Sequence, residues 1–271
     1  MQETTAAPGA RAADETILVE RDGPIATVVL NRPAKLNALT RPMWRLLGQT
    51  MDRLSAEDSL RCVILRGAGE KAFSPGNDIA EFETERANRE QAIGYGHDMH
   101  ETARAIADCR HPTLAQIHGI CVGGGLEIAA LCDMRICGES SRFGAPIKNL
   151  GLVMAYPEME PLVRLVGPSV ALEILFEGRI FDANEAKDKR LVNRVVPDER
   201  VAQECRETAQ RIADGAPLVA RWHKRFARRL ASAEPLSEAE YLECFDCFDT
   251  EDFRIGYRAF LAKQKPEFVG R

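Results

Sequence analysis

A run of three glycines followed by a carboxylate most constrains how this chain can fold. Residues 123–127 read Gly-Gly-Gly-Leu-Glu, after the apolar run at 113–117 and before the helix-forming stretch at 128–133. This order predicts a strand, a tight turn and the N-terminus of a helix. Glycines let backbone N–H groups approach a ligand, and the helix end favours negative charge. Glu127 would stand beside such an oxyanion site as a general base, with a plain turn as the alternative.

A second glycine segment strengthens this interpretation. Residues 71–79 read Lys-Ala-Phe-Ser-Pro-Gly-Asn-Asp-Ile and follow a strand-like run. Pro75 removes a backbone donor, and Gly76 permits an unusual backbone angle, so the N–H of Asn77 can point outward. Together with the N–H of Gly124, it would hold an acyl oxygen as charge develops there. The alternative is a surface turn whose aspartate caps the next helix.

The order of patterns along the chain predicts an α/β fold. Strand-like and helical segments alternate, and the turn residues Asp-Gly-Pro join the first two strands into a hairpin. The expected strands are 16–20, 26–30, 61–66 and 113–117, and the expected helices 41–54 and 90–108. After residue 198 no strand is expected, and helices are predicted at 199–232, 235–249 and 251–264. We therefore expect a disordered tail at 1–14, an α/β core at 15–198 and a helical C-terminal part at 199–271.

Composition narrows the class of protein. The net charge of −5 argues against non-specific nucleic-acid binding. No apolar run has the length of a membrane span, and the N-terminus lacks the pattern of a signal peptide. The eight cysteines are therefore expected to be reduced thiols in a cytoplasmic protein. Cys244 and Cys247 have metal-like spacing but no second pair, so we expect a packing face and no metal site.

Six segments, in order, resemble the crotonase (enoyl-CoA hydratase/isomerase) superfamily. They are VLNRPAKLNAL at 29–39, FSPGNDI at 73–79, HGICVGGGLE at 118–127, CDMRI at 132–136, RFGAP at 142–146 and GYRAFLAK at 256–263. The resemblance runs from about residue 17 to the C-terminus. It implies a spiral of repeated strand-strand-helix units with a helical C-terminal part, and an acyl-CoA thioester as substrate with no further cofactor. It also implies a homotrimer or hexamer, because crotonase relatives meet through their C-terminal helices.

The resemblance also implies roles for individual residues. Asn77 and Gly124 would form the oxyanion site, and Glu127 would be the first of two catalytic glutamates. Coenzyme A would lie along the edge formed by the first two segments. The C-terminal helix, often that of a neighbouring subunit, would complete the binding site. The residues implied for this binding are Lys35, Leu36, Ala38, Pro75, Asp78, Ile79, Phe260 and Lys263.

The chain departs from the family pattern at the second glutamate. That residue should follow Phe-Gly-x-Pro, but here the position is Ile147, a hydrocarbon that can neither move a proton nor hold a water. Glu158 and Tyr156 fall in the segment that normally skirts the catalytic water, and Glu158 is the better candidate to compensate. The alternative for Glu158 is a helix start, with Pro157 at the first helical position and Glu158 near the positive end of the helix. His100 is a weaker candidate for acting on an acyl group.

Three hypotheses remain open from the sequence. In the favoured one, Glu127 moves a proton at the carbon next to the thioester, which covers isomerisation, a lyase reaction or an atypical hydration. In the second, a decarboxylase-like member needs only the oxyanion site and an apolar pocket, which Ile147 suits. In the third, the chain binds acyl-CoA without catalysis. A buried, idle carboxylate at Glu127 would be costly, which argues against the third hypothesis.

Overall fold

The computed structural model describes residues 15–271, so the tail predicted at 1–14 lies outside the described residues. Within the described part, two sheets are built from strands that alternate along the chain. The larger sheet has the order β1-β2-β3-β5-β7-β10 and the smaller one β4-β6-β8-β9. The large-sheet strands are β1 (Ile17–Asp22), β2 (Ile25–Leu30), β3 (Cys62–Gly67), β5 (Thr113–Ile117), β7 (Met134–Gly138) and β10 (Arg194–Val196). The small-sheet strands are β4 (Ala72–Ser74), β6 (Ile120–Val122), β8 (Arg142–Gly144) and β9 (Phe181–Asp182).

This alternation produces the expected spiral. Each of the pairs β3/β4, β5/β6 and β7/β8 places one strand in the large sheet and the next in the small one, and a helix then leads to the following pair. Neighbours β2, β3, β5 and β7 pair in parallel, whereas β1 and β2 form the predicted antiparallel hairpin. Parallel strands covered on both faces need near-continuous apolar sequence, which β3 and β5 have. The α/β class and the repeated strand-strand-helix architecture are confirmed.

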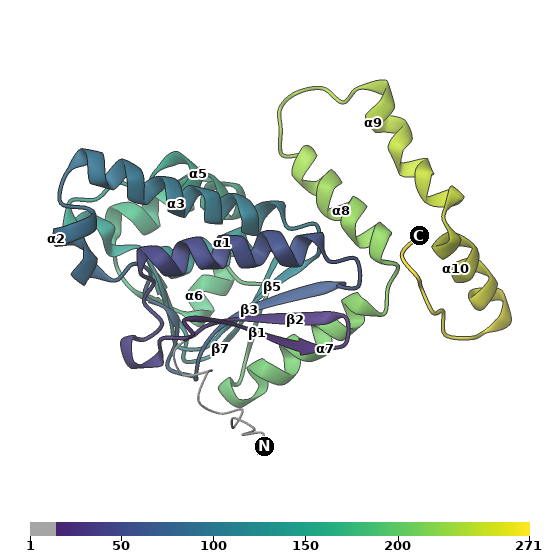
Figure 1. Ribbon diagram of the computed structural model, residues 1–271, viewed down its shortest axis with the longest axis horizontal. Coiled ribbons are helices and arrows are strands. Elements are labelled where there is room, and N and C mark those ends of the chain that lie inside the picture. Colours follow the sequence, from purple (N-terminus) through teal and green to yellow (C-terminus); the bar gives the residue numbers. More distant parts are fainter. Residues whose placement is uncertain (1–14) are drawn as a thin grey trace, which may run out of the picture.

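Helices cover both faces of the large sheet. Helices α1, α3 and α5 lie on one side and α7 on the other (Figure 1). The α-helices are α1 (Arg41–Ala56), α2 (Phe82–Glu85), α3 (Arg89–Asp108), α4 (Gly124–Leu131), α5 (Tyr156–Glu177), α6 (Ala183–Asp188), α7 (Val201–Ala213), α8 (Pro217–Arg229), α9 (Glu238–Leu242) and α10 (Glu251–Ala262). Short 3-10 helices are η1 (Pro33–Lys35), η2 (Ile79–Glu81), η3 (Pro146–Leu150), η4 (Asp198–Arg200) and η5 (Glu243–Asp249). The main core lies between the sheet and the α1 side, with a smaller one under α7.

The C-terminal part is helical, as expected, but it is more broken than the sequence pattern indicates. The predicted helix 199–232 is two helices, because Gly215 and Pro217 interrupt it and α8 starts in a new direction. The predicted helix 235–249 is the short α9 followed by the 3-10 helix η5. From α8 onward the chain leaves the body as an arm (Figure 1).

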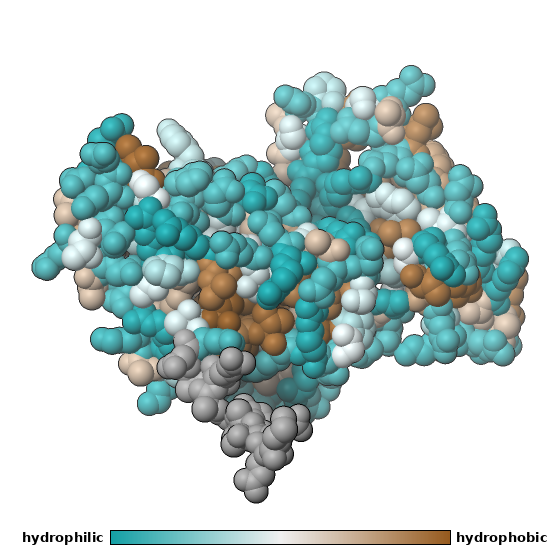
Figure 2. Space-filling view, viewed as in Figure 1, coloured by the Kyte–Doolittle hydropathy of each residue, from teal (hydrophilic) through white to brown (hydrophobic). Residues whose placement is uncertain are grey.

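The arm exposes aromatic side chains. Phe245, Phe248 and Phe260 are more than half exposed, and Figure 2 shows apolar surface gathered on this part of the molecule. Cys244 is exposed and Cys247 partly so, which differs from the predicted packing face, because the short η5 stands away from the body. The other six cysteines are buried free thiols. No helix within 15–271 is long and apolar enough to span a membrane.

Candidate active site

The two glycine segments meet backbone to backbone. Gly76 has a φ of +91°, and a Cβ added there would lie 2.4 Å from the nitrogen of Gly124. A Cβ on Gly125 would lie 2.1 Å from the carbonyl oxygen of Ser74. Only glycine allows such an approach, so the end of β4 and the start of α4 are pressed together at this point. The pairing of β4 with β6, the strand just before α4, holds them in register.

This contact brings two unpaired backbone donors together. Gly124 is the first residue of α4, so its N–H has no acceptor within the helix. Asn77 forms a parallel bridge with Leu39 that uses the carbonyl of Gly76 and the N–H of Asp78. The N–H of Asn77 therefore points the other way and donates no hydrogen bond within the described residues. Two adjacent N–H groups at a helix N-terminus have the chemistry needed to bind an oxyanion.

Trp44 of α1 contacts both halves of this donor pair. Its indole N–H donates to the side-chain oxygen of Asn77 at 2.6 Å. Its ring also lies against Gly124, where an added Cβ would be 3.2 Å from Cζ2. Trp44 is almost completely buried. The sequence gives no signal for this role of Trp44, because a tryptophan on the apolar face of an amphipathic helix does not indicate that its indole N–H makes a hydrogen bond.

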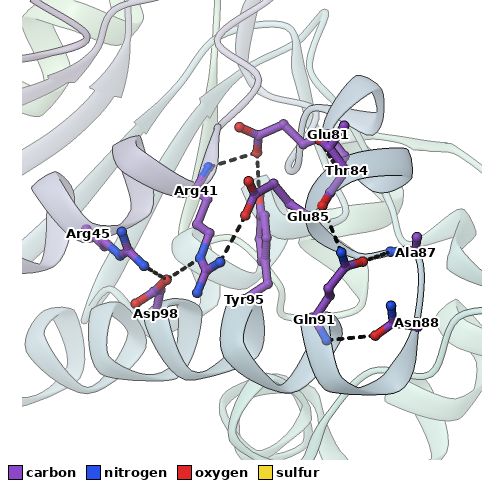
Figure 3. A network of polar contacts seen from close by, with 10 residues as sticks. All are labelled: Arg41, Arg45, Glu81, Thr84, Glu85, Ala87, Asn88, Gln91, Tyr95 and Asp98. Carbon is purple, nitrogen blue, oxygen red and sulfur yellow. Dashed lines mark hydrogen bonds and ion pairs between the residues drawn. The ribbon is translucent and has the colours of Figure 1, made fainter.

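A polar network fixes α1 against α3 beside the donor pair (Figure 3). Tyr95 Oη donates to Glu81 Oε2 at 3.1 Å and lies 3.4 Å from the side-chain oxygen of Asn77. Burial, reinforced by Glu81, raises the pKa of the Tyr95 phenol, so it remains a donor. Arg41 binds Asp98 at 2.6 Å and Glu85 at 2.9 Å, which ties α1 to both α2 and α3. The loop that carries Asn77 therefore lies next to side chains that hydrogen bonds and ion pairs hold in place.

Glu127 follows the donor pair in the first turn of α4 and is unusually easy to protonate. Its carboxyl group makes no hydrogen bond or ion pair with any of residues 15–271. Burial raises its pKa to about 8, and the negative charge of Glu158 contributes, while Arg86 acts in the opposite direction. Near neutral pH we therefore expect Glu127 to hold a proton, which the nearby charge of Glu158 favours.

Glu158 comes to this site from the start of α5. Its Oε2 accepts a hydrogen bond from the backbone N–H of Ala155 at 3.0 Å, and its Oε1 lies 3.4 Å from Nε2 of His100. The expectation that residues 156–158 begin a helix is thus also correct. Tyr156 is 90% exposed and is not held at the site. Ile147 lies on η3 and packs against the core.

The segments predicted to bind coenzyme A lie side by side. The Leu39–Asn77 bridge joins them, and Arg32 donates to Ala38 O at 2.7 Å and to Asp78 Oδ2 at 3.0 Å. Lys35 and Leu36 are exposed on and just after η1, and Ile79 is exposed on η2. Ala38 is buried, Pro75 is half-buried, and Asp78 caps η2. The two segments are therefore neighbours, as the prediction requires, and their binding of coenzyme A stays a prediction.

The two predicted residues of the C-terminal helix lie elsewhere. Phe260 is 83% exposed on α10, and Lys263 ends that helix in the left-handed region. In Figure 1, α10 lies at the opposite end of the molecule from α2. One chain alone does not bring them to the glycine segments. Residues 15–271 also contain no group of His, Cys, Asp and Glu arranged to hold a metal ion.

Comparison with known proteins decides the family. The model of the enoyl-CoA hydratase/isomerase family matches residues 20–271. The chain belongs to this family. A probable enoyl-CoA hydratase of Rhizobium meliloti is 35% identical over 95% of this chain and 99% of its own length. A short-chain-enoyl-CoA hydratase of Clostridium acetobutylicum is 32% identical over 93% of this chain and 96% of its own length.

Solved structures agree. An enoyl-CoA hydratase/carnithine racemase from Magnetospirillum magneticum superposes with a TM-score of 0.93 at 52% identity, covering 95% of this chain and 96% of that one. A putative enoyl-CoA hydratase/isomerase family protein from Hyphomonas neptunium superposes with a TM-score of 0.92 at 34% identity, covering 96% of this chain and 100% of that one. The chain is thus an acyl-CoA-processing enzyme of the enoyl-CoA hydratase/isomerase kind.

Trp44→Phe tests whether the indole N–H orients this enzyme's donor pair. The variant keeps most of the ring packing but loses one hydrogen bond to Asn77, so kcat/KM with an enoyl-CoA thioester should fall about 10-fold. Trp222→Phe on α8 changes the only other tryptophan and should have no effect. Equal kcat/KM values for Trp44→Phe and wild type would contradict the role of this bond.

Glu127→Gln tests the raised pKa through stability. The folded chain holds the Glu127 proton between its ordinary pKa of 4.5 and about 8, where the unfolded chain has released it. The free energy of unfolding of the wild type therefore falls as pH rises through this window, and that of the variant has no such contribution. Urea unfolding should show that the free energy of unfolding of the variant, relative to that of wild type, rises by on the order of 1 to 3 kcal/mol between pH 5 and pH 8. A difference independent of pH would contradict the shift.

Proposed function

We propose that the chain hydrates the double bond of a 2-enoyl-CoA thioester. The observation that carries the proposal is that α4 and α5, which pack together, place Glu127 and Glu158 in their first turns, and the charge of Glu158 contributes to the raised pKa of Glu127. The family's usual position for the second carboxyl group holds Ile147, and we assign its role to Glu158. The names of the relatives, which include a crotonyl-CoA hydratase from Syntrophomonas wolfei at 30% identity, support a hydratase.

The proposed reaction divides the work between the two carboxyl groups. The thioester oxygen binds the N–H groups of Asn77 and Gly124. The Glu158 carboxylate takes a proton from water as the hydroxyl adds to C3, and the electron pair of the double bond moves toward the thioester as an enolate. The donor pair stabilises the negative oxygen. Protonated Glu127 then gives its proton to C2, which yields the 3-hydroxyacyl-CoA, and a proton passes back from Glu158 to Glu127.

We also propose that the edge formed by residues 33–39 and 75–79 binds coenzyme A. The exposed charge of Lys35 suits a phosphate, and the apolar Leu36 and Ile79 suit the pantetheine arm and acyl chain. No cofactor is required beyond the coenzyme A of the substrate. Self-association as a trimer or hexamer would let the exposed Phe260 and Lys263 complete a neighbour's site, which the aromatic surface of the arm supports.

Turnover of crotonyl-CoA, followed as loss of the enoyl-thioester absorbance, tests the proposed reaction. Glu127→Gln and Glu158→Gln should each lower kcat by about 100- to 10,000-fold, because each removes one proton-transfer group. Acyl-CoA affinity should persist in both. Glu160→Gln, two residues along α5 and paired with Arg164 on the surface, is the control and should match wild type.

The alternatives give different results in the same assay. Full activity of Glu158→Gln would mean that Glu127 works alone. A wild type that binds acyl-CoA tightly without hydrating it would contradict the hydratase. Turnover of a malonyl-type thioester that survives Glu127→Gln would then indicate a decarboxylase, and binding without any turnover would indicate a non-catalytic protein.

A further inference from the structure

His100 on α3 lies against Glu158 at the start of α5. Its Nε2 is buried and has no hydrogen-bond partner within the described residues, and the closest charged atom is Oε1 of Glu158 at 3.4 Å. The Glu158 side chain is 13% exposed and the His100 side chain 34% exposed. A buried ring nitrogen is costly to leave unpaired, so this contact indicates an interaction that closes when the histidine and the carboxylate carry opposite charges.

The rest of the His100 ring lies at a cavity of about 560 Å³ between α3, α4, α5 and α8. The other charged side chains that line this cavity are Arg104, Asp108, Asp133, Arg135, Glu160, Arg164 and Arg228. Each of them already has a partner. Arg164 forms an ion pair with Glu160, and Arg228 forms ion pairs with Asp108 and Asp133. Arg104 also forms an ion pair with Asp108. Arg135 donates to three backbone carbonyls, those of Leu191, Ala129 and Cys132.

His100 is therefore the one ionisable group at this cavity, among the described residues, whose charged partner is Glu158. No basic side chain forms an ion pair with Glu158 from α4 or α5, and Arg86 acts on Glu127. The two glutamates thus differ in their surroundings. Glu158 has a backbone N–H at a helix start and an imidazole, whereas Glu127 has no hydrogen-bond partner within 15–271. Glu158 thus has two groups beside it that can hold its carboxylate in place, and Glu127 has none in the described part of the chain.

We propose that His100 is a positioning residue that holds the Glu158 carboxylate in place, so that Glu158 activates water and the proton of Glu127 goes to C2. This inference rests on the proposed function, because the assignment decides which glutamate activates water and which protonates C2. A positively charged imidazole beside Glu158 would stabilise the carboxylate, so we expect His100 to extend the activity toward acid pH.

The test compares His100→Leu, which removes the interaction, with His100→Gln, whose amide can donate to Glu158 without carrying charge. His100→Leu should lower kcat about 10- to 100-fold at neutral pH with KM nearly unchanged. It should also move the acidic limb of the kcat profile upward by about one pH unit. His100→Gln should recover much of kcat at neutral pH but keep the displaced limb. His97→Gln, one turn earlier on the exposed face of α3, is the matched control and should behave as wild type.

An infrared measurement on the substrate-free protein tests the same assignment without turnover. The carbonyl band of a protonated buried carboxylic acid should be present near neutral pH in wild type, lost in Glu127→Gln and kept in Glu158→Gln. In His100→Leu, a second such band should appear and be absent from the His100→Leu, Glu158→Gln double variant. A His100→Leu variant with the wild-type spectrum and pH profile would overturn the inference.

The two proposals fail in distinguishable ways. If wild type does not hydrate crotonyl-CoA but the infrared bands follow the expected pattern, the proposed function is wrong and the His100 assignment stands. If wild type hydrates crotonyl-CoA and Glu158→Gln is inactive, but His100→Leu is indistinguishable from wild type, only the His100 assignment is wrong. Circular dichroism of each variant separates a local effect from loss of the fold.

Discussion

The contact between Gly76 and Gly124 is the constraint on which the site depends. Their backbones approach so closely that a single Cβ on Gly76 would fall 2.4 Å from the nitrogen of Gly124. The alternating sheets make this approach possible, because β4 and β6 pair in the small sheet and each leads directly into one of the two loops. Trp44 then packs across both loops from α1. The N–H groups of Asn77 and Gly124 come from separate loops that meet here, as the proposed oxyanion site requires.

Helix α4 serves the site at both of its ends. Its N-terminus offers the N–H of Gly124 and, one turn later, the carboxyl group of Glu127. At its C-terminus, the guanidinium of Arg135 donates to Ala129 O at 3.2 Å, which also accepts from the N–H of Cys132, and to Cys132 O. A buried arginine is stable there only because carbonyl oxygens surround it. The short helix is thereby fixed in place, which a preorganised oxyanion site requires.

The sequence predicted the parts of the structure that depend on local patterns. The β1–β2 hairpin, the buried strand β5 and the glycine turn into α4 all appear where apolar runs and turn residues indicated them. The sequence also made Glu158 a candidate for the missing second carboxylate; its charge contributes to the raised pKa of Glu127, and its catalytic role stays a prediction. Local patterns failed where tertiary contacts decide. The helix break at Gly215 falls within a segment whose apolar residues have helical spacing. The spacing of residues also does not indicate that Tyr156 is exposed or that the indole of Trp44 donates to Asn77.

The central claim is that the N–H groups of Asn77 and Gly124 polarise the thioester carbonyl. It is tested most directly by the infrared carbonyl stretch of a bound, ¹³C-labelled saturated acyl-CoA such as butyryl-CoA. The account predicts that the stretch moves to lower frequency on binding to wild type and to Gly23→Ala, whose hairpin glycine also has positive φ but open space around it. In Gly76→Ala, whose added methyl separates the two loops, the bound ligand should lose most of this shift. A bound carbonyl with the same frequency as in water, or a shift that survives Gly76→Ala unchanged, would contradict it.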